Sequence, residues 1–167
     1  IGVAGAGGLL LTQGYRMERI TVWLDPAASE KGHQTIQGLY AIGSGGLFGK
    51  GLGQSMQKLG FLPEANNDMI FSVICEELGL FGALCVLALF FALIWRFMVI
   101  AVNAPDLYGS MIVVGVIAHI GIQVFINIAV ATNTIPNTGI PLPFISYGGS
   151  SLVFMLLEMG LVLSVSR

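Results

Sequence analysis

The chain has 167 residues, of which 55% are hydrophobic and only 10% are charged, and its formal net charge is −2. An ordinary soluble domain carries roughly 25% charged residues, so this composition excludes a water-soluble globular protein. It also provides no basic surface of the kind that binds nucleic acid, and we expect no nucleic-acid partner.

The charged residues are unevenly distributed along the chain. Twelve of the sixteen lie between Arg16 and Glu77, and none occurs from Leu107 to Leu157. A helix that crosses a bilayer needs about 20 apolar residues, so the uncharged stretch must hold more than one span. Cys75 and Cys85 match no metal or redox spacing, and we expect both to be packing residues.

The first elements in chain order are a partial membrane span and a long polar stretch. Residues 1–12 are apolar and follow no basic segment, so we expect the end of a truncated transmembrane helix in a piece of a larger protein. Residues 13–77 hold most of the charges and a glycine-rich run over residues 43–53. We expect this stretch to be a large extracytoplasmic loop that contains short helices.

Three long apolar segments follow, separated by residues that interrupt helices. They predict complete transmembrane helices over residues 78–100, 108–131 and 144–166. The loop over residues 132–143 contains three prolines, which no continuous helix would carry.

The side of the membrane is predicted from the basic residues near the helix ends. Arg96 and Arg167 mark the ends of the first and last complete helices, and both fall on the cytoplasmic side. The loop over residues 101–107 is then cytoplasmic, and the loop over residues 132–143 is extracytoplasmic. The predicted fold class is an all-α integral membrane protein with about three complete transmembrane helices and one truncated helix.

Polar side chains inside the predicted spans are candidates for function. His119, Gln123 and Asn127 are four residues apart, so they share one helical face that should contact protein rather than lipid. Glu158 is an ionisable residue in the last span, and it either serves a functional site or pairs with another helix. His119 is open to the same two interpretations, a helix-packing group or a functional one.

Carboxylates gather where the polar stretch meets the first complete span. Glu64 and Asp68 are four residues apart and would share one face of a helix. They could solvate a helix start, where the helix dipole favours negative charge, or accept a proton during group transfer. Glu76 and Glu77 could anchor the helix at the interface, and we expect one of them to face protein.

The glycine-rich run admits two interpretations. Glycine amides beside Lys50 could bind a phosphate group. The run is not a Walker A loop, because Gly51 follows Lys50 where serine or threonine is required. The alternative is a tight turn with close backbone packing.

Three stretches together resemble the FtsW/RodA/SpoVE family of cell-wall glycan polymerases. They are the glycine-rich run, the block from Leu62 to Gly79, and the stretch from Thr138 to Ser151 that reads TGIPLPFISYGGSS. The resemblance covers essentially the whole chain and matches the second half of a family member with about ten spans. Asn66, Asn67 and Met69 depart from the commonest family pattern, so the division, elongation and sporulation subfamilies remain open.

The resemblance implies a peptidoglycan glycosyltransferase that polymerises lipid II outside the membrane, with Asp68 as the essential carboxylate. It also implies candidate substrate-binding residues: Lys50, Glu64, Ser146 and Tyr147. The diphosphate leaving group needs cationic stabilisation, for which Lys50, the glycine amides or a divalent cation are candidates. No other cofactor and no metal ligand is assigned.

The resemblance further implies a multi-pass protein of the bacterial plasma membrane, with contacts to membrane lipid and to a class B penicillin-binding transpeptidase. Two other functions remain open. One is a flippase for lipid II, with Glu158 and His119 as pathway residues. The other is a non-catalytic scaffold for the transpeptidase.

Overall fold

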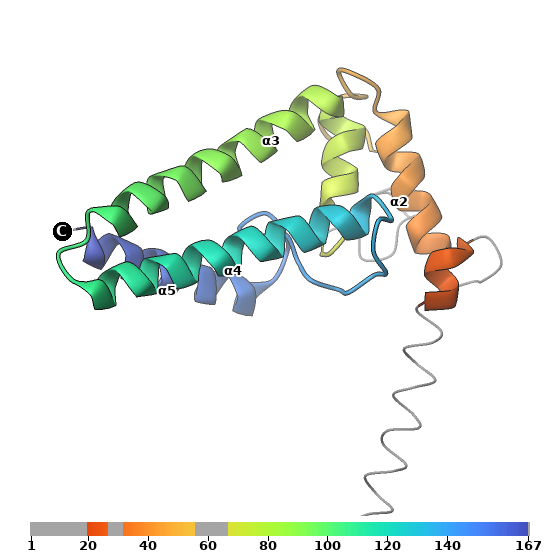
Figure 1. Cartoon of the computed structure of the whole chain (residues 1–167). Coiled ribbons are helices and arrows are strands. Elements are labelled where there is room, and N and C mark those ends of the chain that lie inside the picture. Colours follow the sequence, from red (N-terminus) through yellow and green to blue (C-terminus); the bar gives the residue numbers. More distant parts are fainter. Residues whose placement is uncertain (1–19, 27–31, 56–66, 167) are drawn as a thin grey trace, which may run out of the picture.

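The computed structural model describes residues 20–26, 32–55 and 67–166 (Figure 1). The principal helices in these ranges are α2 (His33–Ser44), α3 (Ile70–Val102), α4 (Leu107–Ala131) and α5 (Gly149–Val165). These ranges contain helices, turns and loops but no strand, which confirms the predicted all-helical class. The truncated span predicted over residues 1–12 lies outside the described residues.

Helix α3 is bent near its beginning. Gly79 has a φ of 68° and a ψ of −166°, a conformation that glycine adopts far more easily than other residues. The bend divides α3 into a short arm, residues 70–78, and a long arm, residues 80–102 (Figure 1). The sequence predicted a transmembrane helix from residue 78, whereas α3 begins eight residues earlier and residue 78 adjoins the bend.

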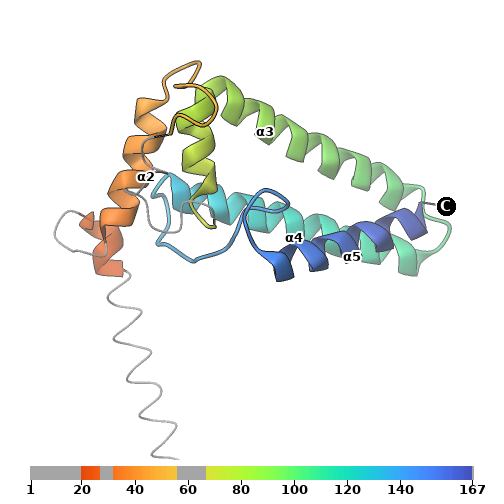
Figure 2. The same ribbon diagram turned by 180° about the vertical axis from the view of Figure 1, so that it is seen from behind.

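Helices α4 and α5 run beside each other, and α4 returns toward the short arm of α3 (Figures 1 and 2). The turn before α4 ends at Asp106, whose carboxylate accepts a hydrogen bond of 3.2 Å from the Gly109 amide. Such a side-chain cap satisfies one of the free amides at a helix start.

The last helix begins later than the sequence predicts. α5 begins at Gly149, so the predicted helix start at residue 144 is wrong by five residues. The physical reason is local, because Phe144 follows Pro143 and has a φ of 62°, which a right-handed helix cannot accommodate. Residues 144–148 instead complete the loop that follows α4.

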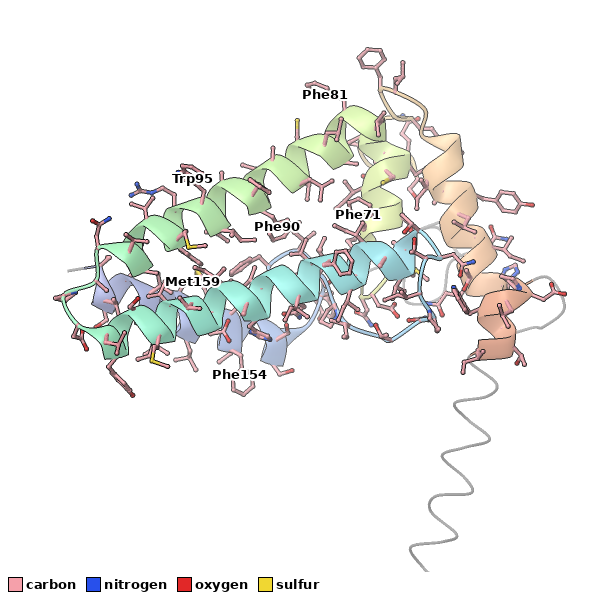
Figure 3. The ribbon with its side chains drawn as sticks, in the orientation of Figure 1. Phe71, Phe81, Phe90, Trp95, Phe154 and Met159 are labelled. Carbon is pink, nitrogen blue, oxygen red and sulfur yellow. The ribbon has the colours of Figure 1, made fainter. Side chains whose placement is uncertain are left out.

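The helices enclose a narrow apolar core and leave much apolar surface outside it. Phe71 and Phe90 are buried, whereas Phe81, Trp95 and Phe154 project from the outer faces (Figure 3). Helices α3 and α4 are long and apolar enough to cross a membrane, and α5 is a shorter apolar helix. Outward-facing apolar side chains on helices of this length are those of a membrane protein.

The two cysteines differ in their surroundings. Cys75 is buried in the core, as expected for a packing residue, whereas Cys85 is exposed on the long arm of α3.

Candidate active site

Asp68 lies immediately before the short arm of α3 and is held through its backbone. Its carbonyl oxygen accepts a hydrogen bond of 2.8 Å from Asn127 Nδ2, and the same nitrogen donates to the Ile140 carbonyl at 2.8 Å. Asn127 is fully buried near the end of α4. One amide therefore ties three segments together: the start of α3, the end of α4 and the following loop.

A second tie joins the loop to the residue before Asp68. The Ser146 hydroxyl donates to the Asn67 carbonyl at 2.6 Å and accepts from the Leu142 amide at 2.7 Å. Ser146 thus fixes its own loop and the approach to Asp68. Tyr147, the next residue, has 83% of its surface exposed.

Asp68 is only 8% exposed. Its Oδ1 lies 3.5 Å from Gln34 Nε2 of α2, at the long limit of a hydrogen bond. A carboxylate in this position is largely removed from bulk water, and its backbone is fixed by α4. Such an arrangement can hold a proton acceptor in a set direction.

A groove of about 330 Å³ opens beside this site. Its walls come from the first residue of α3 and from the loop and first turn of α5: Ile70, Ile145, Ser146, Tyr147, Gly148, Gly149 and Leu152. Two of the predicted substrate-binding residues, Ser146 and Tyr147, therefore line one groove, and its wall also includes Ile70, which is two residues after Asp68 in the chain. Its walls are mainly apolar, which suits a ligand with an apolar part.

The glycine-rich run packs against the bend of α3. The Lys50 and Gly51 amides donate to the carbonyls of Glu76 and Glu77, at 2.9 and 3.0 Å. The Leu80 and Phe81 amides donate to carbonyls of the run, those of Gly46 and Leu47, at 2.9 and 3.1 Å. Close backbone packing, one of the two interpretations of the run, accounts for these contacts.

Lys50 is directed at a glutamate in the short arm. Its Nζ lies 2.7 Å from Glu76 Oε1, and the Glu76 side chain is fully buried. The other Glu76 oxygen accepts from the Ser55 hydroxyl at 2.5 Å. The expectation that one of Glu76 and Glu77 faces protein is confirmed, and the residue is Glu76.

The three residues of the polar stripe on α4, His119, Gln123 and Asn127, each contact protein, as the sequence predicted. Gln123 Nε2 donates to the Pro141 carbonyl at 3.1 Å, in addition to the Asn127 contacts. His119 Nδ1 lies 2.8 Å from Glu158 Oε1, so Glu158 is paired across α4 and α5. These two residues form a separate cluster, because Asn127 and Gln123 occupy the part of α4 nearer to Asp68.

Glu64 lies outside the described residues, and its predicted role is left as a prediction. Within the part of the chain that the structure describes, no three His, Cys, Asp or Glu side chains gather closely enough to hold a metal ion. The sequence had not assigned a site role to Asn127 or Glu76. Asn127 was marked by its place in the polar stripe, and Glu76 by its place in the family block.

Several known proteins are similar to this chain in sequence. Stage V sporulation protein E of Bacillus subtilis (strain 168) is 56% identical over 171 residues, which cover 100% of this chain and 46% of that protein. The probable peptidoglycan glycosyltransferase FtsW of Geobacter sp. (strain M18) is 43% identical over 168 residues, covering 99% and 46%. The chain thus spans about half the length of these curated relatives.

Two solved structures are similar to this chain in fold. One, described as the structural coordination of polymerization and crosslinking by a peptidoglycan synthase complex, matches with a TM-score of 0.70 and 30% identity, over 99% of this chain and 48% of that chain. The crystal structure of the rod shape determining protein RodA of Thermus thermophilus matches with a TM-score of 0.58 and 39% identity, over 77% and 38%. The fold described above is therefore RodA-like.

The family itself is shown by a match along the whole chain. The family model for FtsW, RodA and SpoVE, described as cell cycle protein, matches residues 1–167. The chain therefore belongs to the FtsW/RodA/SpoVE family.

Proposed function

We propose that the protein containing this chain is a peptidoglycan glycosyltransferase that polymerises lipid II into glycan strands at the outer side of the bacterial plasma membrane. Similar relatives are named as probable peptidoglycan glycosyltransferases, among them the FtsW of Geobacter sp. at 43% identity. The observation that carries the proposal is the buried carboxylate of Asp68, whose backbone is fixed by Asn127.

The reaction requires a proton acceptor. The hydroxyl of one sugar attacks the anomeric carbon of another unit, a new C–O bond forms, and the bond to undecaprenyl diphosphate breaks. The attacking hydroxyl loses its proton as the bond forms, and we assign Asp68 as the acceptor. A positioned carboxylate within hydrogen-bond reach typically contributes about 10²- to 10⁴-fold to such a rate.

The other candidate residues have different roles in this proposal. Ser146 and Tyr147 line the groove beside Asp68, and we assign them to substrate binding. Lys50 is the weaker candidate for the diphosphate, because its ammonium group already pairs with Glu76. The positive charge that stabilises the diphosphate is therefore better sought in a divalent cation or in residues beyond those described.

We further propose that α3, α4 and α5 all cross the plasma membrane and that the Asp68 end faces outward. The partner is a class B penicillin-binding transpeptidase. One similar solved structure is described as a synthase complex that coordinates polymerization and crosslinking, and crosslinking is transpeptidase chemistry.

The test uses the full-length protein with its transpeptidase partner and purified lipid II. Asp68→Asn preserves the shape of the side chain but removes its capacity to accept the proton, so we expect polymerisation to fall at least about 100-fold. Expression and lipid II binding should remain. Undiminished polymerisation by the variant would refute the assignment of Asp68.

The same variant tests the flippase function, and the wild-type protein tests the scaffold function. A flippase with a distinct pathway would continue to move lipid II across vesicles after polymerisation is lost. A scaffold would support crosslinking by its transpeptidase partner while the wild-type protein shows no polymerisation of its own.

A further inference from the structure

Glu76 is an unusually enclosed carboxylate. Its side chain is fully buried, and it accepts hydrogen bonds from Lys50 Nζ, from the Ser55 hydroxyl and, at 3.5 Å, from the Ser44 hydroxyl. The Lys50 side chain is 36% exposed, but burying the Glu76 charge costs free energy that its attraction to Lys50 only partly offsets, so this ion pair is weak evidence for stability. A role in fixing one particular geometry gives a physical reason for the pair.

The geometry that the pair fixes is the bend of α3. On one side of Gly79, the glycine-rich run is joined to Glu76 and Glu77, and on the other side it is joined to Leu80 and Phe81. The run therefore spans the bend. The Lys50–Glu76 contact adds a charged link between the run and the short arm.

The glycine-rich run packs so closely against the bend that the angle at Gly79 cannot change unless the run also moves. A Cβ atom added to Gly79 would lie 2.4 Å from the Gly49 amide nitrogen, and one added to Gly49 would lie 2.1 Å from the Glu77 carbonyl oxygen. The two backbones are in direct contact at these glycines. A shift of the run would therefore turn the short arm about Gly79.

The short arm acts as a lever for Asp68. Asp68 and Gly79 are eleven residues apart, which corresponds to about 16 Å along a helix. A change of about 10° in the bend corresponds to roughly 3 Å at that distance, so it would stretch or break the Asn127 hydrogen bond to the Asp68 carbonyl and redirect the Asp68 carboxylate. A displacement of about 1 Å at a catalytic group can lower a rate by roughly 100-fold.

We propose that Lys50 and Glu76 are positioning residues that hold the short arm at the angle at which Asp68 meets the substrate. The proposal rests on the proposed function, because it takes Asp68 to be the proton acceptor. Glu76 itself is closed to substrate by its burial. Lys50 acts through Glu76 and not through the diphosphate.

The experiment compares lipid II polymerisation by full-length variants in complex with the transpeptidase partner. Glu76→Gln removes the negative charge, and Lys50→Met removes the positive charge while keeping a long side chain. We expect each to lower kcat about 100-fold, with KM for lipid II within about threefold of wild type and with the thermal midpoint largely retained. Lys50→Arg keeps the charge and should restore most of kcat.

Glu77→Gln is the matched control. Glu77 is the neighbouring glutamate of the same arm, and its Oε1 has no hydrogen-bond partner among the described residues. Its carbonyl bond to Gly51 survives the substitution. We expect wild-type kcat and KM for this variant.

The outcomes separate this inference from the proposed function. Wild-type kcat in Glu76→Gln and Lys50→Met, with Asp68→Asn inactive, would overturn the positioning role alone. Activity in Asp68→Asn would overturn the proposed role of Asp68. A rise in KM as large as the fall in kcat would assign Lys50 to substrate binding, and loss of folded protein in both variants would make the pair a stability element; either result would overturn the inference.

Discussion

His119 Nδ1 lies 2.8 Å from Glu158 Oε1, and this contact joins the midpoint of α4 to α5. The polar stripe of α4 thus has a protein contact at each of its three positions, through His119, Gln123 and Asn127. In a membrane protein, polar groups without partners are costly, so each contact specifies where a neighbouring segment must lie.

The His119–Glu158 contact predicts a coupled pair. We expect His119→Leu and Glu158→Leu each to lower the free energy of unfolding, because each leaves one ionisable group without its partner. The double variant should lose less than the sum of the two, by about 0.6 kcal/mol and at most about 1.7 kcal/mol. Thermal unfolding of the full-length protein in detergent measures this difference. Ser164→Leu, an exposed polar-to-leucine change on α5, is the control, and simple additivity would contradict the pairing.

We expect substitution of Asn127 to lower the free energy of unfolding more than loss of the His119–Glu158 contact does. Asn127→Leu retains the number and branching of the side-chain heavy atoms but leaves the carbonyls of Asp68 and Ile140 without this donor. Each buried polar group deprived of its partner costs about 1–3 kcal/mol, so we expect clear destabilisation in the same unfolding assay. Asn103→Leu changes an exposed amide that, among the described residues, donates to the Val99 carbonyl of its own helix, and it should cost little. Equal costs for the two variants would refute the bridging role of Asn127.

Gly79 predicts a strict requirement for glycine at the bend. Gly79→Ala places a methyl group against the backbone of the glycine-rich run, at a φ of 68° and a ψ of −166°, a conformation that costs other residues about 1–3 kcal/mol even without a clash. We expect reduced stability and reduced polymerisation. Gly115→Ala, within α4, is the control, because its added Cβ meets nothing within 4 Å. A variant at position 79 as stable as this control would show that the bend is not required.

The proposed orientation predicts which cysteines react from outside the cell. Leu52, which is 77% exposed in the glycine-rich run, should react with a membrane-impermeant maleimide after Leu52→Cys in intact spheroplasts. Asn103→Cys, at the opposite end of α3, should react only after permeabilisation. Of the two cysteines of this chain, Cys75 is buried and Cys85 is exposed, so Cys85 is replaced in the background. The reverse pattern of labelling would invert the topology.

The sequence alone predicted the class of the protein and several contacts of the polar residues. Composition was sufficient for the membrane protein, because about 10% charged residues cannot cover a surface in water. The four-residue spacing of His119, Gln123 and Asn127 was sufficient to place them on one face that contacts protein. Local patterns of this kind depend only on helix geometry and on the cost of polar groups in lipid.

Only the tertiary structure decided how separate segments meet. The sequence offered Lys50 as a phosphate ligand, and the structure places its ammonium group against Glu76, 26 residues later. The sequence predicted that one span begins at residue 78 and another at residue 144. In the structure, α3 begins before residue 78 and bends at Gly79, and the positive φ of Phe144 keeps α5 from beginning there. These features arise from contacts between residues far apart in the chain. No local pattern of apolar and polar residues encodes such contacts, because their geometry exists only once the helices have packed together.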